Sequence, residues 1–374
     1  MELMFWIPAA IILYVYAGYP CLLAAWARIA DRRPRSHGAT GTWPAISIVV
    51  AARNETERLP GRVADLLAQD YPGASEIIVV SDGSTDEPAA ALAPFADRVR
   101  LIEVPAGGKP AALNAGVVAS HGEILVFADA RQRFAPGAIA HLVSNFADPQ
   151  VGGATGELVL DTERDGSSGT GVAEGVGLYW RFEKWLRRNE SRVWSTLGAT
   201  GAIYALRRSL WRPLPAPTLL DDVLAPMRAV LAGYRIVVEE RAVAFDHASA
   251  DAAAEGRRKK RTLAGNYQIL AQEPRLLVPF VNPVWLQYVS HKVGRLVAPW
   301  AMVAVLIASA LLTPSGWIYA LAFAAQVAFY GLAAAGGVFR ATERLAGVAS
   351  AFVVMNFSAI AGLAALRSGR AGWR

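Results

Sequence analysis

Long uncharged apolar stretches lie near both ends of the chain, and a polar region separates them. They cover residues 3–27, 296–339 and 345–366, and the second contains the sequence TPSG at 313–316. About 20 apolar residues suffice to cross a bilayer as a helix, and a Pro-Gly-containing tetrad is typical of a turn. The pattern therefore predicts four membrane-spanning helices, one before the polar region and three after it.

Charges beside these stretches indicate an orientation. Glu2 stands where a signal peptide would carry basic residues, so we interpret residues 1–28 as an N-terminal span. Basic residues follow this span: Arg28, Arg32, Arg33 and Arg35. The positive-inside bias then predicts an integral protein of the inner or plasma membrane with its polar region in the cytoplasm. Four crossings would place the basic C-terminal tail outside, so either the tail tolerates this or one segment does not cross.

The polar region alternates short apolar segments with amphipathic ones. Segments rich in β-forming residues occur at 45–52, 77–81, 99–104 and 124–128, and helical spacing occurs at 59–69, 87–96 and 109–120. Strands buried on both faces of a parallel sheet have this composition. The alternation predicts an α/β, Rossmann-like, mostly parallel sheet, whose ligands sit beyond the carboxyl ends of the strands.

Polar clusters follow three of these predicted strands. They are Arg53-Asn54-Glu55, the DGSTD sequence at 82–86, and Asp129-Ala130-Arg131. Each alone is typical of helix caps and turns. Three at successive strand ends indicate a site at one edge of the sheet.

Composition and missing motifs narrow the chemistry. Of the 374 residues 54% are hydrophobic and 18% charged, with a net charge of +6, and a single cysteine, Cys21, excludes intrachain disulfides and cysteine-built zinc sites. The chain has no GxGxxG, P-loop, HExxH or GxSxG motif. The sequence therefore gives no indication of a nicotinamide-dependent enzyme, a P-loop nucleotidase, a zincin metalloprotease or an α/β-hydrolase. Carboxylates repel a diphosphate unless a divalent cation lies between them, which makes Asp129 a candidate metal ligand.

Six segments in order resemble the membrane-embedded family 2 glycosyltransferases, relatives of cellulose, chitin and hyaluronan synthases. The segments are SIVVAARNE (47–55), VVSDGSTD (79–86), GGKPAALNAG (107–116), FADA (127–130), TGAIYALRR (200–208) and LDDVLAPMRAVLAGYRIV (220–237). The resemblance covers roughly residues 45 to 265. It implies a GT-A catalytic domain at 45–250 after a linker at 29–44, then basic or interfacial helices at 251–292, and membrane helices at 293–374.

The resemblance also implies roles for individual residues. Asp129 matches the first acid of the DxD element and would bind the diphosphate through Mg²⁺ or Mn²⁺, while Asp222 matches the general base. The implied nucleotide-sugar site comprises Ala51, Glu55, Asp82, Lys109, Asn114 and Asp129. The implied acceptor and diphosphate region comprises Thr200, Gly201, Asp221, Arg258 and Arg261.

Two departures from the family pattern bear on function. Arg131 replaces the second DxD acid, and the QxxRW element becomes RKKRT at 258–262, which argues against long-chain processivity. This basic run has three interpretations: diphosphate or acceptor binding, attraction of lipid headgroups, or a solvated face. Nucleic acid is not an expected partner, because the run is short and lacks interleaved aromatic residues. Residues 276–293 form either an interfacial amphipathic helix or an ordinary packing helix.

The function implied is inverting transfer of a sugar from a nucleotide-sugar, a UDP-sugar in the first instance, to a lipid-linked or polysaccharide acceptor. The alternative is a regulatory member that binds nucleotide-sugar with impaired catalysis, suggested by Arg131. A transporter is disfavoured, because the apolar stretches lack the intramembrane charges that mark a translocation path.

Overall fold

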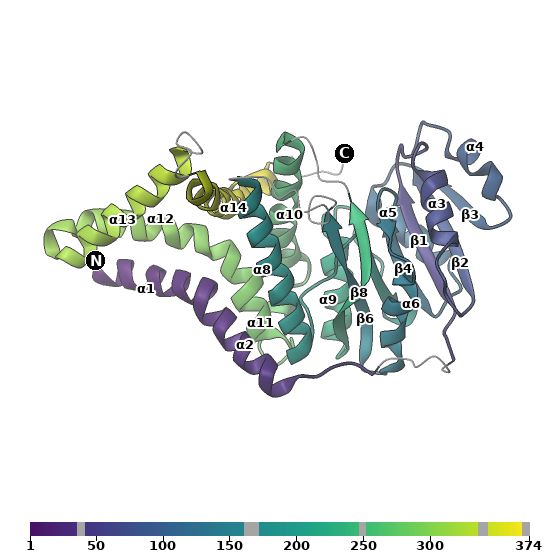
Figure 1. The fold of residues 1–374 in the computed structure, drawn as a ribbon, viewed down its shortest axis with the longest axis horizontal. Coiled ribbons are helices and arrows are strands. Elements are labelled where there is room, and N and C mark those ends of the chain that lie inside the picture. Colours follow the sequence, from purple (N-terminus) through teal and green to yellow (C-terminus); the bar gives the residue numbers. More distant parts are fainter. Residues whose placement is uncertain (36–41, 161–171, 247–251, 336–342, 369–374) are drawn as a thin grey trace.

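The computed structural model describes residues 1–35, 42–160, 172–246, 252–335 and 343–368 (Figure 1), with the side chains of 172–176, 252–259 and 343–344 outside the described part. The α/β part lies at one end and long helices at the other, with α8 (Val172–Val193) and α10 (Ala252–Gln272) between them.

Within the described residues, eight strands form one mixed sheet in the order β3-β2-β1-β4-β7-β6-β8-β5. Strands β3, β2, β1 and β4 are parallel; β7 is antiparallel to β4 and β6, and β8 is parallel to β6 and antiparallel to β5. The strands are β1 (Ile46–Ala52), β2 (Ser75–Asp82), β3 (Val99–Val104), β4 (Ile124–Asp129), β5 (Arg133–Phe134), β6 (Val151–Leu160), β7 (Ile203–Arg207) and β8 (Arg235–Asp246). The four strands predicted from apolar segments are confirmed. The side chains of β1, β2 and β4 are mostly buried on both faces, as in Val49 and Val50 of β1, whereas the edge strand β3 is partly exposed.

Helices cover the sheet and bring their first turns to the carboxyl edge of the parallel strands. Helix α5 packs on β1 and β2, and α9 packs on β6 and β8. The helices of this part are α3 (Leu59–Leu67), α4 (Pro88–Leu92), α5 (Lys109–Val118), α6 (Ala138–Ser144) and α9 (Asp221–Leu231). This is the arrangement in which open α/β sheets bind ligands.

Four helical segments of the described chain are long and apolar enough to cross a membrane: Glu2–Ala30, Trp285–Ser315, Trp317–Ala335 and Leu345–Arg367. They match the four predicted spans, and the turn predicted at 313–316 falls at Thr313–Ser315. The helices within them are α1 (Glu2–Leu13), α2 (Tyr19–Ala30), α11 (Trp285–Gln287), α12 (Gly294–Leu312), α13 (Trp317–Ala335) and α14 (Glu343–Arg367). Helical turns with wider, π-type spacing connect α1 to α2 and α11 to α12, so each of these pairs runs as one helix.

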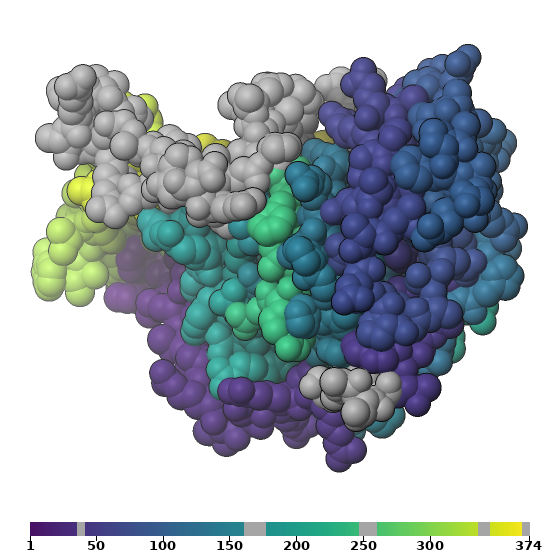
Figure 2. Space-filling model, turned by 45° about the vertical axis from the view of Figure 1, so that its right-hand side comes forward, coloured from purple at the N-terminus to yellow at the C-terminus, as the bar shows by residue number. Residues whose placement is uncertain are grey.

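Helices α8 and α10 join the two parts of the molecule. Helix α14 packs against both, and α8 also packs against α2. Figure 2 shows the purple N-terminal helices on the same side of the molecule as the teal residues of α8. Residues 276–293 do not form a separate surface helix, because the chain is helical from Trp285 directly into α12 and His291 is buried. Of the two interpretations of this segment, the structure favours the packing helix.

Candidate active site

A cavity of about 410 Å³ lies between the sheet edge and the long helices. Its walls include Asp129 at the end of β4, Lys109 at the start of α5 and Asp222 at the start of α9. Side chains of α8, α10, α12 and α14 complete it. The cavity therefore extends from the edge of the sheet to helices that could cross a membrane.

The loops after β1 and β2 are bonded to each other at this edge. The side-chain oxygen of Asn54 accepts the backbone N–H of Thr85 at 2.9 Å, and Asp86 accepts the N–H of Thr56 at 2.8 Å. Two of the polar clusters noted after predicted strands thus meet in space, as the parallel topology requires.

Asp82 holds the loop that leads into α5. Its Oδ1 accepts the backbone N–H groups of Gly107 and Gly108 at 2.7 and 3.0 Å, and Arg53 lies 3.9 Å from Oδ2. The residue is only 1% exposed and does not line the cavity. Since so buried a carboxylate offers almost no surface to a nucleotide, we expect Asp82 to act through the loop rather than by direct contact.

The ammonium of Lys109 lies between two carboxylates. Its Nζ is 2.8 Å from Oδ1 of Asp129 and 3.5 Å from Oδ2 of Asp221. Burial alone would lower the pKa of Lys109, but these two carboxylates outweigh it and hold the pKa above its usual range. Lys109 is therefore a fixed positive charge that joins the end of β4 to the start of α9.

Asp222 is set apart from this ion pair. Its Oδ2 accepts the backbone N–H of Gly201 at 3.0 Å. Burial raises the pKa of Asp222 to about 6, Asp221 adds to the rise, and Lys109 opposes it. A carboxylate with such a pKa is ionised near neutral pH yet basic enough to take a proton, which suits a general base.

Thr200 and Gly201 lie directly against Asp222 in a turn before β7. A Cβ on Gly201 would sit 3.0 Å from the Oδ2 of Asp222, so the close backbone approach that glycine permits here is to the carboxylate. The hydroxyl of Thr200 accepts a hydrogen bond from Arg187 at 2.7 Å, and the Thr200 N–H donates to Thr155 at 2.8 Å. The turn is thereby held from both sides.

The remaining nucleotide-site candidates lie outside the cavity wall. Ala51 is near the end of β1, and Glu55 follows it and pairs with Arg58. Asn114 exchanges two hydrogen bonds with the backbone of Leu214, each 2.9 Å long. This contact commits its amide to holding the chain before α9, and we expect Asn114 to position that chain.

The three arginines at the positions that depart from the family pattern lie just after β4 and in α10. Arg131 lines the cavity and pairs with Asp246 of β8 at 2.9 Å, so a neutralised cation occupies the position of the missing second acid. Arg261 of α10 lines the cavity, and its Nε is buried with no hydrogen-bond partner in the described part. Arg258 falls in the same helix, but its side chain lies outside the described residues.

A divalent cation fits this donor set only with substrate as co-ligand. Among the described residues, no three His, Cys, Asp or Glu side chains are grouped to hold a metal ion. Asp129 is about one-third exposed, and only its Oδ1 bonds to Lys109. Mg²⁺ commonly binds through one or two carboxylates with waters and substrate phosphates. Asp129 can serve in that way.

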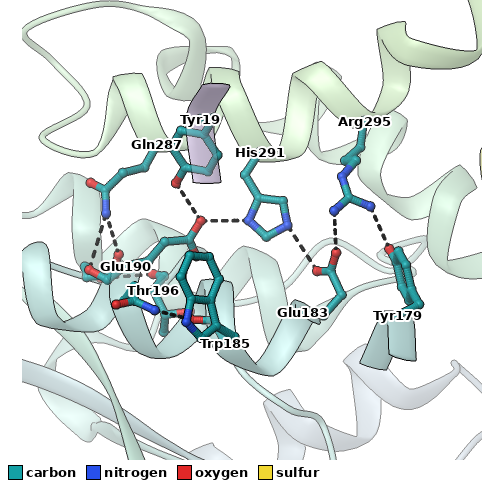
Figure 3. Close-up of polar contacts among 11 residues, drawn as sticks. Tyr19, Tyr179, Glu183, Trp185, Glu190, Thr196, Gln287, His291 and Arg295 are labelled. Atoms are coloured by element: carbon teal, nitrogen blue, oxygen red, sulfur yellow. Dashed lines mark hydrogen bonds and ion pairs between the residues drawn. The ribbon is translucent and has the colours of Figure 1, made fainter. Parts of the chain in front are cut away.

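A polar network that the sequence did not reveal lies where α8 meets the helix that begins at Trp285 (Figure 3), and several of its side chains line the cavity. His291 lies between Glu190 and Glu183, with its ring nitrogens 2.7 and 3.1 Å from their carboxylate oxygens. Glu183 also pairs with Arg295 at 2.9 Å, and Tyr19 donates to Glu190 at 2.9 Å. In the sequence, the only indication of this network was that charged residues stand just before the apolar stretch at 296–339. The network ties α8 to the helix that begins at Trp285 and to α2.

Comparisons with known proteins agree with this geometry. The model for "Glycosyl transferase family 2" matches residues 47–212. An N-acetylglucosaminyltransferase of Bradyrhizobium elkanii is 30% identical over 128 residues, which are 33% of this chain and 70% of that protein. A beta-monoglucosyldiacylglycerol synthase of Nostoc sp. is 33% identical over 129 residues, 32% of this chain and 28% of the relative. An N-acetylglucosaminyltransferase of Azorhizobium caulinodans is 30% identical over 184 residues, 46% of this chain and 44% of the relative.

The matches to the Nostoc and Azorhizobium proteins thus span less than half of either relative. Among solved structures, the mannosyltransferase PcManGT from Pyrobaculum calidifontis in complex with GDP-Man and Mn²⁺ superposes with a TM-score of 0.72 and 21% identity. The superposition covers 98% of this chain and 99% of that one. This likeness shows the fold: a GT-A, Rossmann-like core with apolar helices. The family model, the Bradyrhizobium elkanii relative and the fold agree. The chain belongs to glycosyl transferase family 2.

Proposed function

We propose that this protein is an inverting membrane glycosyltransferase that moves a sugar from a nucleotide-sugar, in the first instance a UDP-sugar, to a lipid-linked or polysaccharide acceptor. One observation carries the proposal: the carboxylate of Asp222, with its raised pKa, faces the same cavity as the Lys109–Asp129 pair. Family membership supports the reaction class, because a glycosyltransferase needs a donor site and a base on one cavity.

The residues divide the reaction between them. The acceptor hydroxyl would approach Asp222, which takes its proton as oxygen attacks the anomeric carbon from the face opposite the leaving nucleoside diphosphate. The N–H of Gly201 fixes the orientation of the Asp222 carboxylate. Lys109 and Arg261 would lie on the diphosphate side, where fixed positive charge favours the departing anion.

Asp129 would hold Mg²⁺ or Mn²⁺ together with diphosphate oxygens, and such an ion supplies charge that favours the leaving group. The Mn²⁺ in the PcManGT complex is in keeping with this choice of ion. Four helices that could cross a membrane support a site beside lipid, and the arginines that follow α2 support a cytoplasmic cavity.

A donor screen tests the proposal. Purified full-length protein in lipid nanodiscs is incubated with UDP- and GDP-sugars, with Mg²⁺ or Mn²⁺ and with membrane lipid extract, and released nucleoside diphosphate and labelled lipid are measured. We expect one nucleotide-sugar to give lipid-dependent release. Donor binding without release under every condition would instead favour the regulatory alternative suggested by Arg131.

A further inference from the structure

Two cations line the cavity beside Asp222 without a carboxylate partner. Arg187 of α8 donates hydrogen bonds to the hydroxyls of Thr200 and Thr155 at 2.7 and 3.2 Å, and both acceptors are neutral. Lys292, next to His291, makes no hydrogen bond or ion pair within the described part of the chain. Across those described residues, no carboxylate oxygen lies within 4.0 Å of either side chain.

Three other cations in the cavity wall are neutralised by carboxylates. Lys109 pairs with Asp129, Arg295 pairs with Glu183, and Arg131 pairs with Asp246. Charges that have left bulk water are normally paired, because desolvation makes an isolated one costly. Arg187 and Lys292 differ from these three, as does Arg261, which would lie on the diphosphate side. The exposed donors of Arg187 and Lys292 favour an anion that enters the cavity.

Electrostatics places both cations close to the reacting end. Lys292 and Asp222 line the same cavity, and the Lys292 ammonium lowers the pKa of Asp222. Arg187 is linked to the same group through Thr200 and the adjacent Gly201, whose N–H binds Asp222. An anion held by Arg187 and Lys292 would therefore lie a short distance from the base.

Part of the cavity wall is apolar. Leu296 of α12 and Met355 of α14 line it, together with Trp180 of α8. Helices α12 and α14 belong to segments that could cross a membrane. One cavity thus offers a base, two cations without a carboxylate partner and apolar side chains of helices that could cross a membrane.

We propose that the acceptor is a lipid-linked sugar whose sugar and apolar chain are joined by a phosphate or diphosphate, and that Arg187 and Lys292 bind this anion. The proposal rests on the proposed glycosyltransferase function and specifies its acceptor. The apolar chain would lie along α12 and α14, and the sugar hydroxyl would reach Asp222. An uncharged glycolipid would leave both cations without a partner.

The test compares two acceptor probes in nanodiscs of phosphatidylcholine. One is N-acetylglucosamine linked by diphosphate to a short prenyl chain, and the other is an uncharged alkyl N-acetylglucosaminide. Binding of each probe is measured by thermophoresis without donor, and transfer and donor hydrolysis are measured separately. We expect Lys292→Gln to weaken binding of the diphosphate-linked probe at least tenfold, and to change binding of the uncharged probe less than twofold.

Arg187→Gln should weaken the same binding at least tenfold, and Arg187→Lys, which keeps the charge, should recover part of it. Lys260→Gln is the matched control, because Lys260 is an exposed basic residue of α10 outside the cavity wall. If the Arg187 variants fold poorly, Lys292→Gln still tests the proposal, because Lys292 makes no hydrogen bond or ion pair with another described residue.

Three results would overturn the proposal: equal binding of both probes by the wild type, unchanged binding in Lys292→Gln, or full competition by phosphatidylglycerol added to the nanodiscs. The last would make the cations a general headgroup site. Failure of the glycosyltransferase function would look different, because donor hydrolysis and transfer would be absent while selective binding of the diphosphate-linked probe persisted.

Discussion

Replacing Asp222 with asparagine separates catalysis from folding. Asparagine keeps an oxygen for the N–H of Gly201 and nearly the same volume, but it cannot take a proton at neutral pH. General bases typically contribute 10² to 10⁴ in rate. We therefore expect Asp222→Asn to lower kcat at least about a hundredfold while the Kd for the nucleotide-sugar changes less than about twofold.

The same substitution should stabilise the protein above pH 6. Burial raises the pKa of Asp222 from 3.8 to about 6, so the folded state binds this proton more tightly than the unfolded chain does. The wild type is therefore progressively destabilised as the pH rises from about 4 to 6, and the loss is complete above that. At 1.36 kcal/mol per pKa unit the difference amounts to about 3 kcal/mol, which asparagine avoids.

Thermal unfolding tests the predicted gain in stability, and kinetics tests the predicted loss of turnover. Both proteins are melted in the same detergent at pH 4.5 and 7.5, and we expect the variant to gain a few degrees in Tm over the wild type at pH 7.5 only. In the wild type, kcat should fall below pH about 6 with the loss of one ionised group. Retained turnover in the variant, or parallel losses of donor affinity and rate, would refute the assignment of Asp222 as the base.

Three further perturbations test the surrounding charges. Lys109→Met leaves the carboxylates of Asp129 and Asp221 without their shared cation, so the KM for the donor should rise at least about tenfold. Unaltered steady-state kinetics would argue against a role of Lys109 in donor binding. His291→Gln removes the cation between Glu183 and Glu190 and should lower the free energy of unfolding by about 3 kcal/mol, measured by denaturant titration in detergent. Chelation with EDTA should abolish nucleoside diphosphate release and Mn²⁺ should restore it, whereas full activity after exhaustive chelation would exclude a required cation.

The sheet and the spans were predictable because each depends on local composition. Strands such as β1 and β4 are short apolar runs between polar turns, and α12 with α13 is uncharged from residue 296 onward and broken at one turn. The second half of the sheet, in which β7 and β5 run antiparallel to their neighbours, was not predicted. Strands β6, β7 and β8 pair across large sequence separations, and no local pattern specifies which strand each will join.

The carboxylates of the site were predictable for a different reason. Asp129 follows a predicted strand, and parallel topology alone brings such ends to one edge. Asp222 came only from the family resemblance, since it lies 93 residues further along the chain. Arg187 and Lys292 carried no signal, because a charge on an amphipathic helix is ordinarily solvated. Only the packing of α8 against the membrane helices turns both toward the cavity.

Helix α8 links the membrane helices to the base mechanically. Its Glu183 and Glu190 are fixed to His291 in the helix that begins at Trp285, and its Arg187 holds the turn at Thr200 that orients Asp222. Because buried, paired groups of this kind are costly to separate, the base is held at one depth relative to the spans. A base at a fixed depth can deprotonate only an acceptor hydroxyl that is held at the same depth. A phosphate bound by Arg187 and Lys292 would hold the acceptor there. The network in Figure 3 therefore favours addition to an anchored lipid over movement of a polymer past the base.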